Sequence, residues 1–212
     1  MNVRLILATG NPGKVAELQD ALRSRGIEVL AAADAGVDDF PPEDGASYDD
    51  NALIKAAHVA ARTGLPALAD DSGLEVDALD GAPGVHSARF GGEGLSDGER
   101  VAHLLARLRR VPAERRGARF VSVLVLASPG GDVRRFEGTC SGRILEGPRG
   151  TGGFGYDPVF WSQDLGKAFG VATPDEKRSV SHRGRALASF LAWLDQDEAR
   201  GVLTAPATPG GP

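Results

Sequence analysis

Residues 3–14 read VRLILATGNPGK, an apolar run that passes directly into a glycine turn. The run from Val3 to Ala8 predicts a short buried strand. Asn11 is a favourable N-cap and Pro12 suits the first position of a helix, so we expect a helix that ends at Gly26. Its apolar face would carry Val15, Leu18, Ala21 and Leu22. A strand, a glycine turn and a helix in this order begin an α/β fold.

The same kinds of signal predict the remaining elements. Capping-box pairs mark two helix starts, at Ser96 with Glu99 and at Thr173 with Glu176. A turn at residues 128–132 separates two β-rich runs and predicts an antiparallel hairpin. The other expected elements are a helix from Asp49 or Asp50 to Arg62, a helix through residues 186–194, and strands over residues 65–69, 118–127 and 133–138. Together they predict an α/β fold with a mixed β-sheet flanked by helices.

The composition is that of a globular chain in a reducing compartment. Hydrophobic side chains make up 42% of the 212 residues and charged ones 25%, which is ordinary for a folded protein. A net charge of −5 gives no basic surface for stable nucleic-acid binding, and the longest apolar stretch, residues 123–127, is too short to cross a membrane. A single cysteine, Cys140, cannot form an internal disulfide, which favours a cytoplasmic location. We expect one domain over residues 1–200 and a disordered tail over residues 201–212.

Thr9-Gly10-Asn11-Pro12-Gly13-Lys14 is a candidate phosphate-binding loop. A glycine turn between a strand and a helix exposes backbone N–H groups at the positive end of the helix dipole, where anions are stabilised. Lys14 adds a positive charge and Thr9 a hydroxyl group. The loop is not a Walker A motif, because Val15 stands where that motif has Ser or Thr. A plain strand–helix connection explains the loop equally well.

Asp70-Asp71-Ser72-Gly73 is a candidate metal site at the end of the strand expected over residues 65–69. Two adjacent carboxylates are costly to bury unless a cation compensates them. Mg²⁺ commonly binds one or two carboxylates together with substrate phosphates, and one aspartate could accept the proton of an attacking water. Taken alone, however, the motif fits a solvated Asx-turn better.

Glycines surround two aromatic side chains in residues 150–158, which read GTGGFGYDP. Phe154 could stack on a planar base, and Asp157 could accept hydrogen bonds from its ring N–H groups. A tight turn with core aromatics is the alternative.

A basic segment follows at residues 177–185. Lys177, Arg183 and Arg185 offer donors for phosphate or for the carbonyl oxygens of a base, and His182 could donate to a 6-oxo group. A solvated basic turn is the alternative. A nucleotide whose phosphates are bridged by a metal would use all four candidate sites.

Five blocks of this sequence resemble motifs of the inosine triphosphate pyrophosphatase family, which removes non-standard purine nucleoside triphosphates. They occur in the family's order, at Thr9–Lys14, Asp70–Leu74, Gly81–Arg89, Gly152–Pro158 and Ser181–Arg183. The resemblance implies a homodimeric, Mg²⁺-dependent enzyme that cleaves ITP, dITP and XTP between the α- and β-phosphates, releasing a monophosphate and pyrophosphate. It also implies an elongated mixed sheet in two lobes, with the nucleotide in a cleft between them.

The resemblance also assigns residues by motif. Asp71 would be metal ligand and proton acceptor, and Ser72 would contact the substrate. The phosphates would be held by Thr9, Gly10, Asn11, Pro12, Gly13 and Lys14. The base and its surroundings would be held by Phe154, Gly155, Tyr156, Asp157, Lys177, His182 and Arg183.

One departure from the family pattern concerns a second acidic metal ligand, which many members carry before a glycine in the loop preceding the second helix. That loop reads Phe40-Pro41-Pro42-Glu43-Asp44-Gly45, and Pro42 stands at the acidic position. Glu43, one residue along, is the expected substitute.

Three alternatives stay open at this point. A related pyrophosphatase acting on pyrimidine or modified triphosphates would share the phosphate loop and the metal. A serine hydrolase built from Ser72, His182 and an aspartate would lack the usual GxSxG elbow. A nucleotide-binding regulatory module would have no need of a positioned base such as Asp71.

Overall fold

A computed structural model describes residues 4–23, 25 and 27–204 of the chain. Its strands form one sheet of seven, in the order β2-β1-β3-β4-β5-β6-β7. β1 is parallel to β2 and to β3, whereas β6 is antiparallel to β5 and to β7. The strands are β1 (Arg4–Leu7), β2 (Glu28–Ala31), β3 (Ala67–Val76), β4 (Gly117–Ala127), β5 (Val133–Ile144), β6 (Phe160–Ser162) and β7 (Lys167–Ala168). The predicted α/β fold with a mixed sheet is therefore confirmed.

Six α-helices are described, and both predicted capping boxes are present, at Ser96 with Glu99 and at Thr173 with Glu176. The helices are α1 (Pro12–Arg23), α2 (Tyr48–Thr63), α3 (Asp97–Arg107), α4 (Pro174–Val180), α5 (His182–Leu194) and α6 (Asp197–Thr204).

Two boundaries of helical segments differ from the prediction. The N-cap of α2 is Ser47, whose hydroxyl accepts the N–H of Asp50, so the acids lie inside the first turn instead of capping it. Residues 201–204, predicted as disordered tail, complete α6, because Val202 and Leu203 are buried. Residues 205–212, the rest of that tail, and Gly26, the predicted end of the first helix, lie outside the described residues.

The chain divides into two compact units, each described here by itself. The first unit comprises Met1–Asp71, Val123–Phe136 and Leu187–Pro212, and the second comprises Ser72–Ser122 and Glu137–Ala186. The single domain expected over residues 1–200 stays a prediction.

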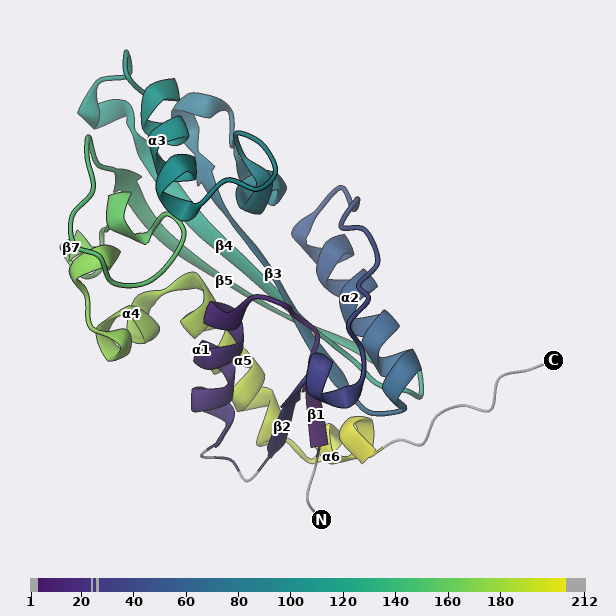
Figure 1. Ribbon diagram of the computed structural model, residues 1–212. Coiled ribbons are helices and arrows are strands. Elements are labelled where there is room, and N and C mark those ends of the chain that lie inside the picture. The colour runs from purple at the N-terminus through teal and green to yellow at the C-terminus, as the bar shows by residue number, and fades with distance from the viewer. Residues whose placement is uncertain (1–3, 24, 26, 205–212) are drawn as a thin grey trace. The chain divides into compact units, whose positions relative to one another are not determined.

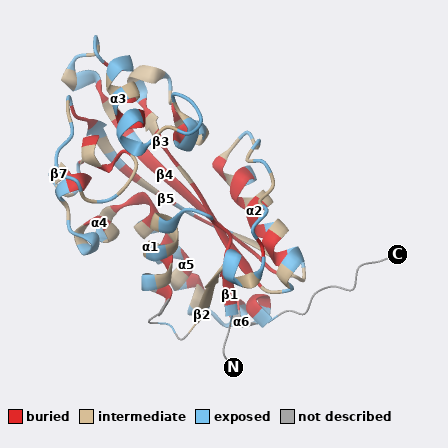
Figure 2. Ribbon diagram, in the orientation of Figure 1, coloured by how far each residue is buried: buried red, intermediate tan, exposed pale blue. Residues whose placement is uncertain are grey.

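In the first unit, α1 connects β1 to β2 and α2 connects β2 to β3. Such crossovers are right-handed, and these two run in opposite directions along the sheet, so the helices cover opposite faces. Figure 1 draws α1 and α2 on either side of β1. The core between them is apolar and appears red in Figure 2. It includes Leu5, Ile6 and Leu7 of β1, Leu18 and Leu22 of α1, and Ala52, Ala56 and Val59 of α2.

The second unit has its own core, formed where α3 packs on strands. Buried members include Leu74, Val101, Leu104, Phe120 and Phe160. Arg116, itself buried, donates to the carbonyl oxygens of Leu108 and Val111, in the segment that follows α3, and to that of Leu145. The segment that carries the aromatic loop is packed on this core through Tyr156 and Val159.

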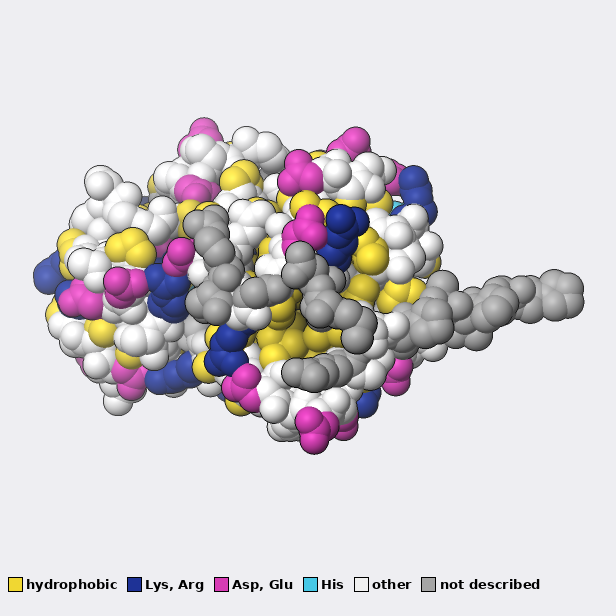
Figure 3. All heavy atoms as spheres, turned by 90° about the horizontal axis from the view of Figure 1, so that it is seen from below, with side chains coloured by type: hydrophobic (Ala, Val, Ile, Leu, Met, Phe, Trp, Pro, Cys, Tyr) yellow, Lys and Arg dark blue, Asp and Glu magenta, His cyan; other side chains and the backbone are white. Residues whose placement is uncertain are grey.

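Within the described part of the chain, every helix is too short or too polar to cross a membrane. On the face drawn in Figure 3, Lys and Arg side chains lie among Asp and Glu side chains instead of gathering in one basic patch.

Candidate active site

The phosphate-loop candidate begins directly after β1, as predicted. Asn11 is the N-cap of α1, because its Oδ1 accepts the N–H groups of Gly13 at 2.9 Å and Lys14 at 3.3 Å. Thr9 Oγ1 accepts the N–H of Asn11 at 3.2 Å. The amides expected to receive a phosphate thus already have side-chain acceptors, and a phosphate oxygen would compete with Asn11 for them.

Asp70 and Asp71 do not follow the end of a strand, as the sequence predicted, but lie in the middle of β3. The strand continues to Val76 because β4 pairs with it on the side away from β1. The Asx-turn alternative is therefore wrong. The pairing with β1 ends at Leu7 and Leu68, so both acids lie just beyond the carboxyl end of β1.

This position is where open α/β sheets bind ligands. The chain passes from β1 to β2 on one side and returns to β3 on the other, so the connections diverge at the carboxyl ends of β1 and β3. Lys14, in the first turn of α1, pairs with Asp70 at this position, with 2.8 Å between Nζ and Oδ2.

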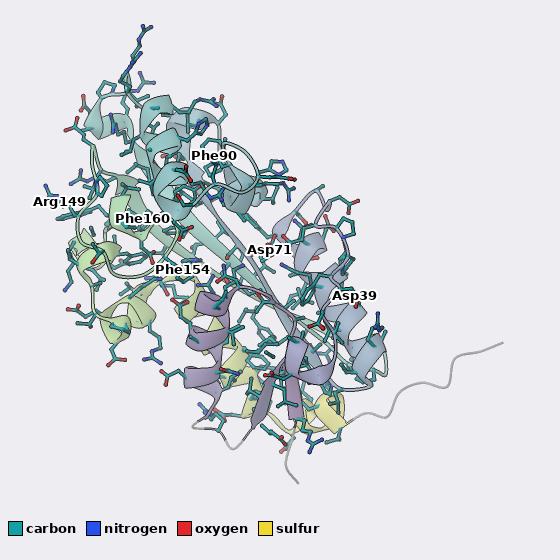
Figure 4. The ribbon with its side chains drawn as sticks, in the orientation of Figure 1. Asp39, Asp71, Phe90, Arg149, Phe154 and Phe160 are labelled. Carbon is teal, nitrogen blue, oxygen red and sulfur yellow. The ribbon has the colours of Figure 1, made fainter. Side chains whose placement is uncertain are left out.

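Asp71 is buried, and side chains of α2 contact its carboxylate. Lys55 Nζ lies 3.5 Å from its Oδ1, and Asn51 Nδ2 donates to its Oδ2 at 3.3 Å. Burial raises the pKa of Asp71, and the charges of Lys55 and Lys14 only partly oppose this. Figure 4 labels Asp71 on β3. A carboxylate with a raised pKa is a better proton acceptor than an ordinary aspartate.

The same lysine connects Asp71 to the acidic loop before α2. Lys55 Nζ lies 2.8 Å from Glu43 Oε1, so two carboxylates converge on one ammonium group. This geometry fits a cation bound by Glu43 and Asp71, with Lys55 occupying the cation's place. Among the described residues, no group of three Asp, Glu, His or Cys side chains is placed so that it could hold a metal ion. Asp39, labelled in Figure 4, pairs instead with Arg62 at 3.0 Å.

A cavity of about 520 Å³ adjoins the loop on the side of β2. Thr9, Gly10 and Pro12 form one wall of it, and Val37 and Phe40 are among the apolar side chains opposite. Asp38 is the one charged residue of this lining, so the cavity does not suit phosphates.

In the second unit, two cations lie against the ring of Phe154. Lys177 Nζ is 4.6 Å and Arg183 Cζ 5.5 Å from the ring centroid. Phe154 of the aromatic loop therefore lies beside Lys177 and Arg183 of the basic segment. Arg185 is not part of this cluster, because its guanidinium binds Thr139 O and Asp164.

Asp157 and Tyr156 hold the aromatic loop in place. Asp157 Oδ2 accepts the N–H of Phe154 at 2.9 Å and the ammonium of Lys177 at 2.7 Å. Tyr156 is buried and donates its hydroxyl to Ser87 O at 2.9 Å, and burial raises the pKa of its phenol. The side chain of Tyr156 therefore points into the unit and not toward a ligand. The Asp97 carboxylate also holds this loop, because its Oδ2 accepts a hydrogen bond from the N–H of Gly155 at 2.6 Å.

His182 and Arg183 begin α5 and are both buried. The His182 imidazole stacks on Phe120, with ring centroids 4.6 Å apart and planes 11° from parallel. Arg183 Nη2 donates to Ser72 Oγ at 3.0 Å. A guanidinium cannot take a proton from a serine, so this contact argues against Ser72 as an activated nucleophile.

Sequence reasoning missed Asn51 and Lys55. Both lie on the buried side of α2, spaced among Ala52, Ala56 and Val59. A lysine and an asparagine four residues apart on an apolar helix face are the signal that could have identified them, because buried polar side chains require partners.

Comparison with known proteins identifies the family of the chain. The model of the Ham1 family matches residues 5–193. A dITP/XTP pyrophosphatase of Thermus thermophilus is 54% identical over 189 residues, covering 89% of this chain and 90% of that protein. The dITP/XTP pyrophosphatase of Yersinia pestis is 48% identical over 190 residues, covering 89% of this chain and 96% of that protein.

Solved structures give the same result. A HAM1 protein from Coxiella burnetii superposes with a TM-score of 0.83 at 38% identity, covering 91% of this chain and 98% of that one. A nucleoside-triphosphatase, dITP/XTP pyrophosphatase, from Mycobacterium abscessus superposes with a TM-score of 0.73 at 47% identity. The superposition covers 89% of this chain and 98% of that one. The family resemblance predicted from the motifs is confirmed, and the chain belongs to the Ham1 family.

Proposed function

We propose that this protein hydrolyses the non-standard purine triphosphates ITP, dITP and XTP to the nucleoside monophosphate and pyrophosphate. Family membership supports the reaction class. The observation in the site that carries the proposal is the convergence of Glu43 and Asp71 on the ammonium of Lys55, beside the loop after β1. Mg²⁺ on a triphosphate is usually held by one or two carboxylates together with the phosphate oxygens, which this pair of carboxylates can supply.

In the proposed mechanism, Glu43 and Asp71 would hold Mg²⁺, which would supply positive charge against the phosphate oxygens. Lys14 and the loop from Thr9 to Gly13 bind the phosphate chain. A water attacks the α-phosphorus; a new P–O bond forms while the bond to the β-phosphate oxygen breaks and pyrophosphate leaves. Asp71 accepts the proton that the water loses.

The second unit supplies base recognition in this proposal. Hypoxanthine and xanthine carry an O6 acceptor, which His182 and Arg183 can meet with N–H donors, whereas adenine presents an amino group there. With adenine in the site, the N–H donors of His182 and Arg183 would be buried without an acceptor. Each such donor costs about 1–3 kcal/mol of binding free energy, which disfavours ATP. Phe154 stacks on the base, and Ser72 contacts the substrate near Arg183.

We further propose that the enzyme acts as a homodimer in the cytoplasm, keeping deaminated purines out of DNA and RNA. The lone buried cysteine, Cys140, fits a reducing compartment. Sedimentation velocity of the full chain tests the oligomeric state of the enzyme.

Product analysis with ITP, dITP, XTP, dUTP, GTP and ATP tests the function, each with Mg²⁺ and with EDTA. We expect monophosphate and pyrophosphate from ITP, dITP and XTP, little from the others, and nothing in EDTA. Cleavage of dUTP in preference to ITP would favour the pyrimidine branch. Orthophosphate as product would place the cleavage at the γ-phosphate and overturn the mechanism. Tight binding of ITP without turnover would favour a regulatory module, and labelling of Ser72 by a fluorophosphonate would favour a serine hydrolase.

A further inference from the structure

Asn51 joins two segments of the first unit. It is fully buried on α2, and its Oδ1 accepts the N–H of Gly45 at 2.9 Å. Its Nδ2 donates to Asp71 Oδ2 at 3.3 Å. Because the N–H of Gly45 can only donate, the amide oxygen must face it, and the amide nitrogen must then face the carboxylate. The orientation of this amide is therefore determined by its two partners.

Lys55, one turn further along α2, connects the same two segments. It contacts Glu43 Oε1 at 2.8 Å and Asp71 Oδ1 at 3.5 Å. The two oxygens of Asp71 thus have different partners on one helix face. Lys55 is a cation and competes with a metal for the oxygens it holds, whereas Asn51 is neutral and holds the other oxygen of Asp71.

We propose that Asn51 is the positioning residue of the metal site. It fixes Asp71 through Oδ2, which leaves Oδ1 for the metal, and through Gly45 it keeps the loop of Glu43 beside that carboxylate. This inference rests on the proposed function, which supplies the metal. The glycine supports it, because a Cβ at position 45 would lie 2.7 Å from Asn51 Oδ1 and 2.7 Å from the Cβ of Asp50. Only glycine lets the loop approach the amide this closely.

The test is Asn51→Leu, which keeps the volume and removes both polar groups. Mn²⁺ binding to the full chain is measured by electron paramagnetic resonance, alone and with pyrophosphate, and kcat and KM for ITP are measured at saturating Mg²⁺. We expect the Mn²⁺ affinity to fall by about 10–100-fold, as for other residues that orient metal ligands, and kcat to fall more than KM rises. Hydrogen exchange at the amide of Gly45 should also accelerate.

The matched control is Val59→Ala, a buried position on the same helix with no polar group. It should lower the melting temperature without changing Mn²⁺ affinity. If Asn51→Leu binds Mn²⁺ as tightly as Val59→Ala does, Asn51 is a structural residue only and the proposal is wrong.

If Asn51→Leu does not fold, Gly45→Ala provides the second test, since its methyl group would push the loop away from Asn51. Reduced Mn²⁺ affinity supports the proposal and unchanged affinity overturns it. A wild-type chain that binds Mn²⁺ but does not hydrolyse ITP would overturn the proposed function only. The Mn²⁺ affinities of Asn51→Leu and Val59→Ala would still decide the role of Asn51.

Discussion

Asp70 and Asp71 are neighbours on β3 but pair with lysines from different helices. Lys14 of α1 lies 2.8 Å from Asp70, and Lys55 of α2 lies 3.5 Å from Asp71. Successive side chains of a strand point to opposite faces of a sheet, and α1 and α2 cover opposite faces. Asp70 is completely buried and closely paired, whereas Asp71 is more loosely paired and has a raised pKa. Asp70 therefore holds the first turn of α1 through Lys14, and Asp71 is the acid to which we assign the proposed proton transfer.

The first prediction follows from this division. Asp71→Asn should abolish ITP turnover while leaving nucleotide binding largely intact, because the amide can neither accept the proton nor bind the metal as a carboxylate does. Asp70→Asn should retain turnover but lower the free energy of unfolding by about 3 kcal/mol, since it removes one partner of a buried ion pair. Initial rates, equilibrium dialysis with ITP and urea unfolding measure these effects. An active Asp71→Asn, or a folded but inactive Asp70→Asn, would reverse the assignment.

Local signals in the sequence predicted much of this structure. The capping boxes at Ser96 and Thr173 lie within four residues of the helix starts that they mark, so no distant contact is needed to recognise them. Asp70 in mid-strand could not be predicted in this way, because its conformation depends on pairing with β4, far along the chain. The inward direction of the Tyr156 side chain likewise depends on its hydrogen bond to Ser87, which is distant in the sequence. The role of Lys55 depends on its contacts with Glu43 and Asp71, which the sequence does not reveal.

The second prediction concerns the ion pair that holds the aromatic loop. Asp157 and Lys177 are buried and 2.7 Å apart, so Asp157→Asn should lower the free energy of unfolding by about 3–5 kcal/mol. KM for ITP should rise as well, because Phe154 loses the carboxylate that accepts its N–H. Asp49→Asn is the control, since its pair with Arg135 is exposed and worth less than about 1 kcal/mol. Equal losses in the two variants, measured by urea unfolding, would contradict the structural role of Asp157.

The third prediction concerns selectivity. His182→Ala should raise the use of ATP relative to ITP, because a donor to O6 favours ITP and disfavours adenine. The ratio of kcat/KM for the two substrates measures this. His182 is also stacked on Phe120, so a change in packing must be separated from the loss of a donor. Phe120→Leu disturbs the same stack but keeps the imidazole. An unchanged ITP/ATP ratio in His182→Ala, or an equal change in Phe120→Leu, would reject the recognition role.

The fourth prediction is a pH dependence of stability from Glu176, in the capping box of α4. Hydrogen bonds from Lys167 Nζ, at 2.6 Å, and from the N–H of Thr173, at 2.8 Å, lower the pKa of this carboxyl. A carboxyl whose pKa is lower in the folded chain binds protons more readily when unfolded. Its contribution is therefore present above the unfolded pKa of about 4.3 and is lost as the pH falls through the folded value. Glu176→Gln lacks this contribution at every pH.

Urea unfolding of both proteins at a series of pH values from 7 down to 3 measures that contribution. Wild type should be more stable than Glu176→Gln at pH 7, and the difference should shrink as the pH falls below about 4.3, because the wild-type carboxyl then becomes protonated and neutral like the amide. Glu99→Gln in the box of α3 should behave in the same way, since bonds from Ser96 lower the pKa of Glu99. A difference that stays constant down to pH 3 would mean that the glutamine loses packing or capping geometry and that the charge of Glu176 contributes nothing.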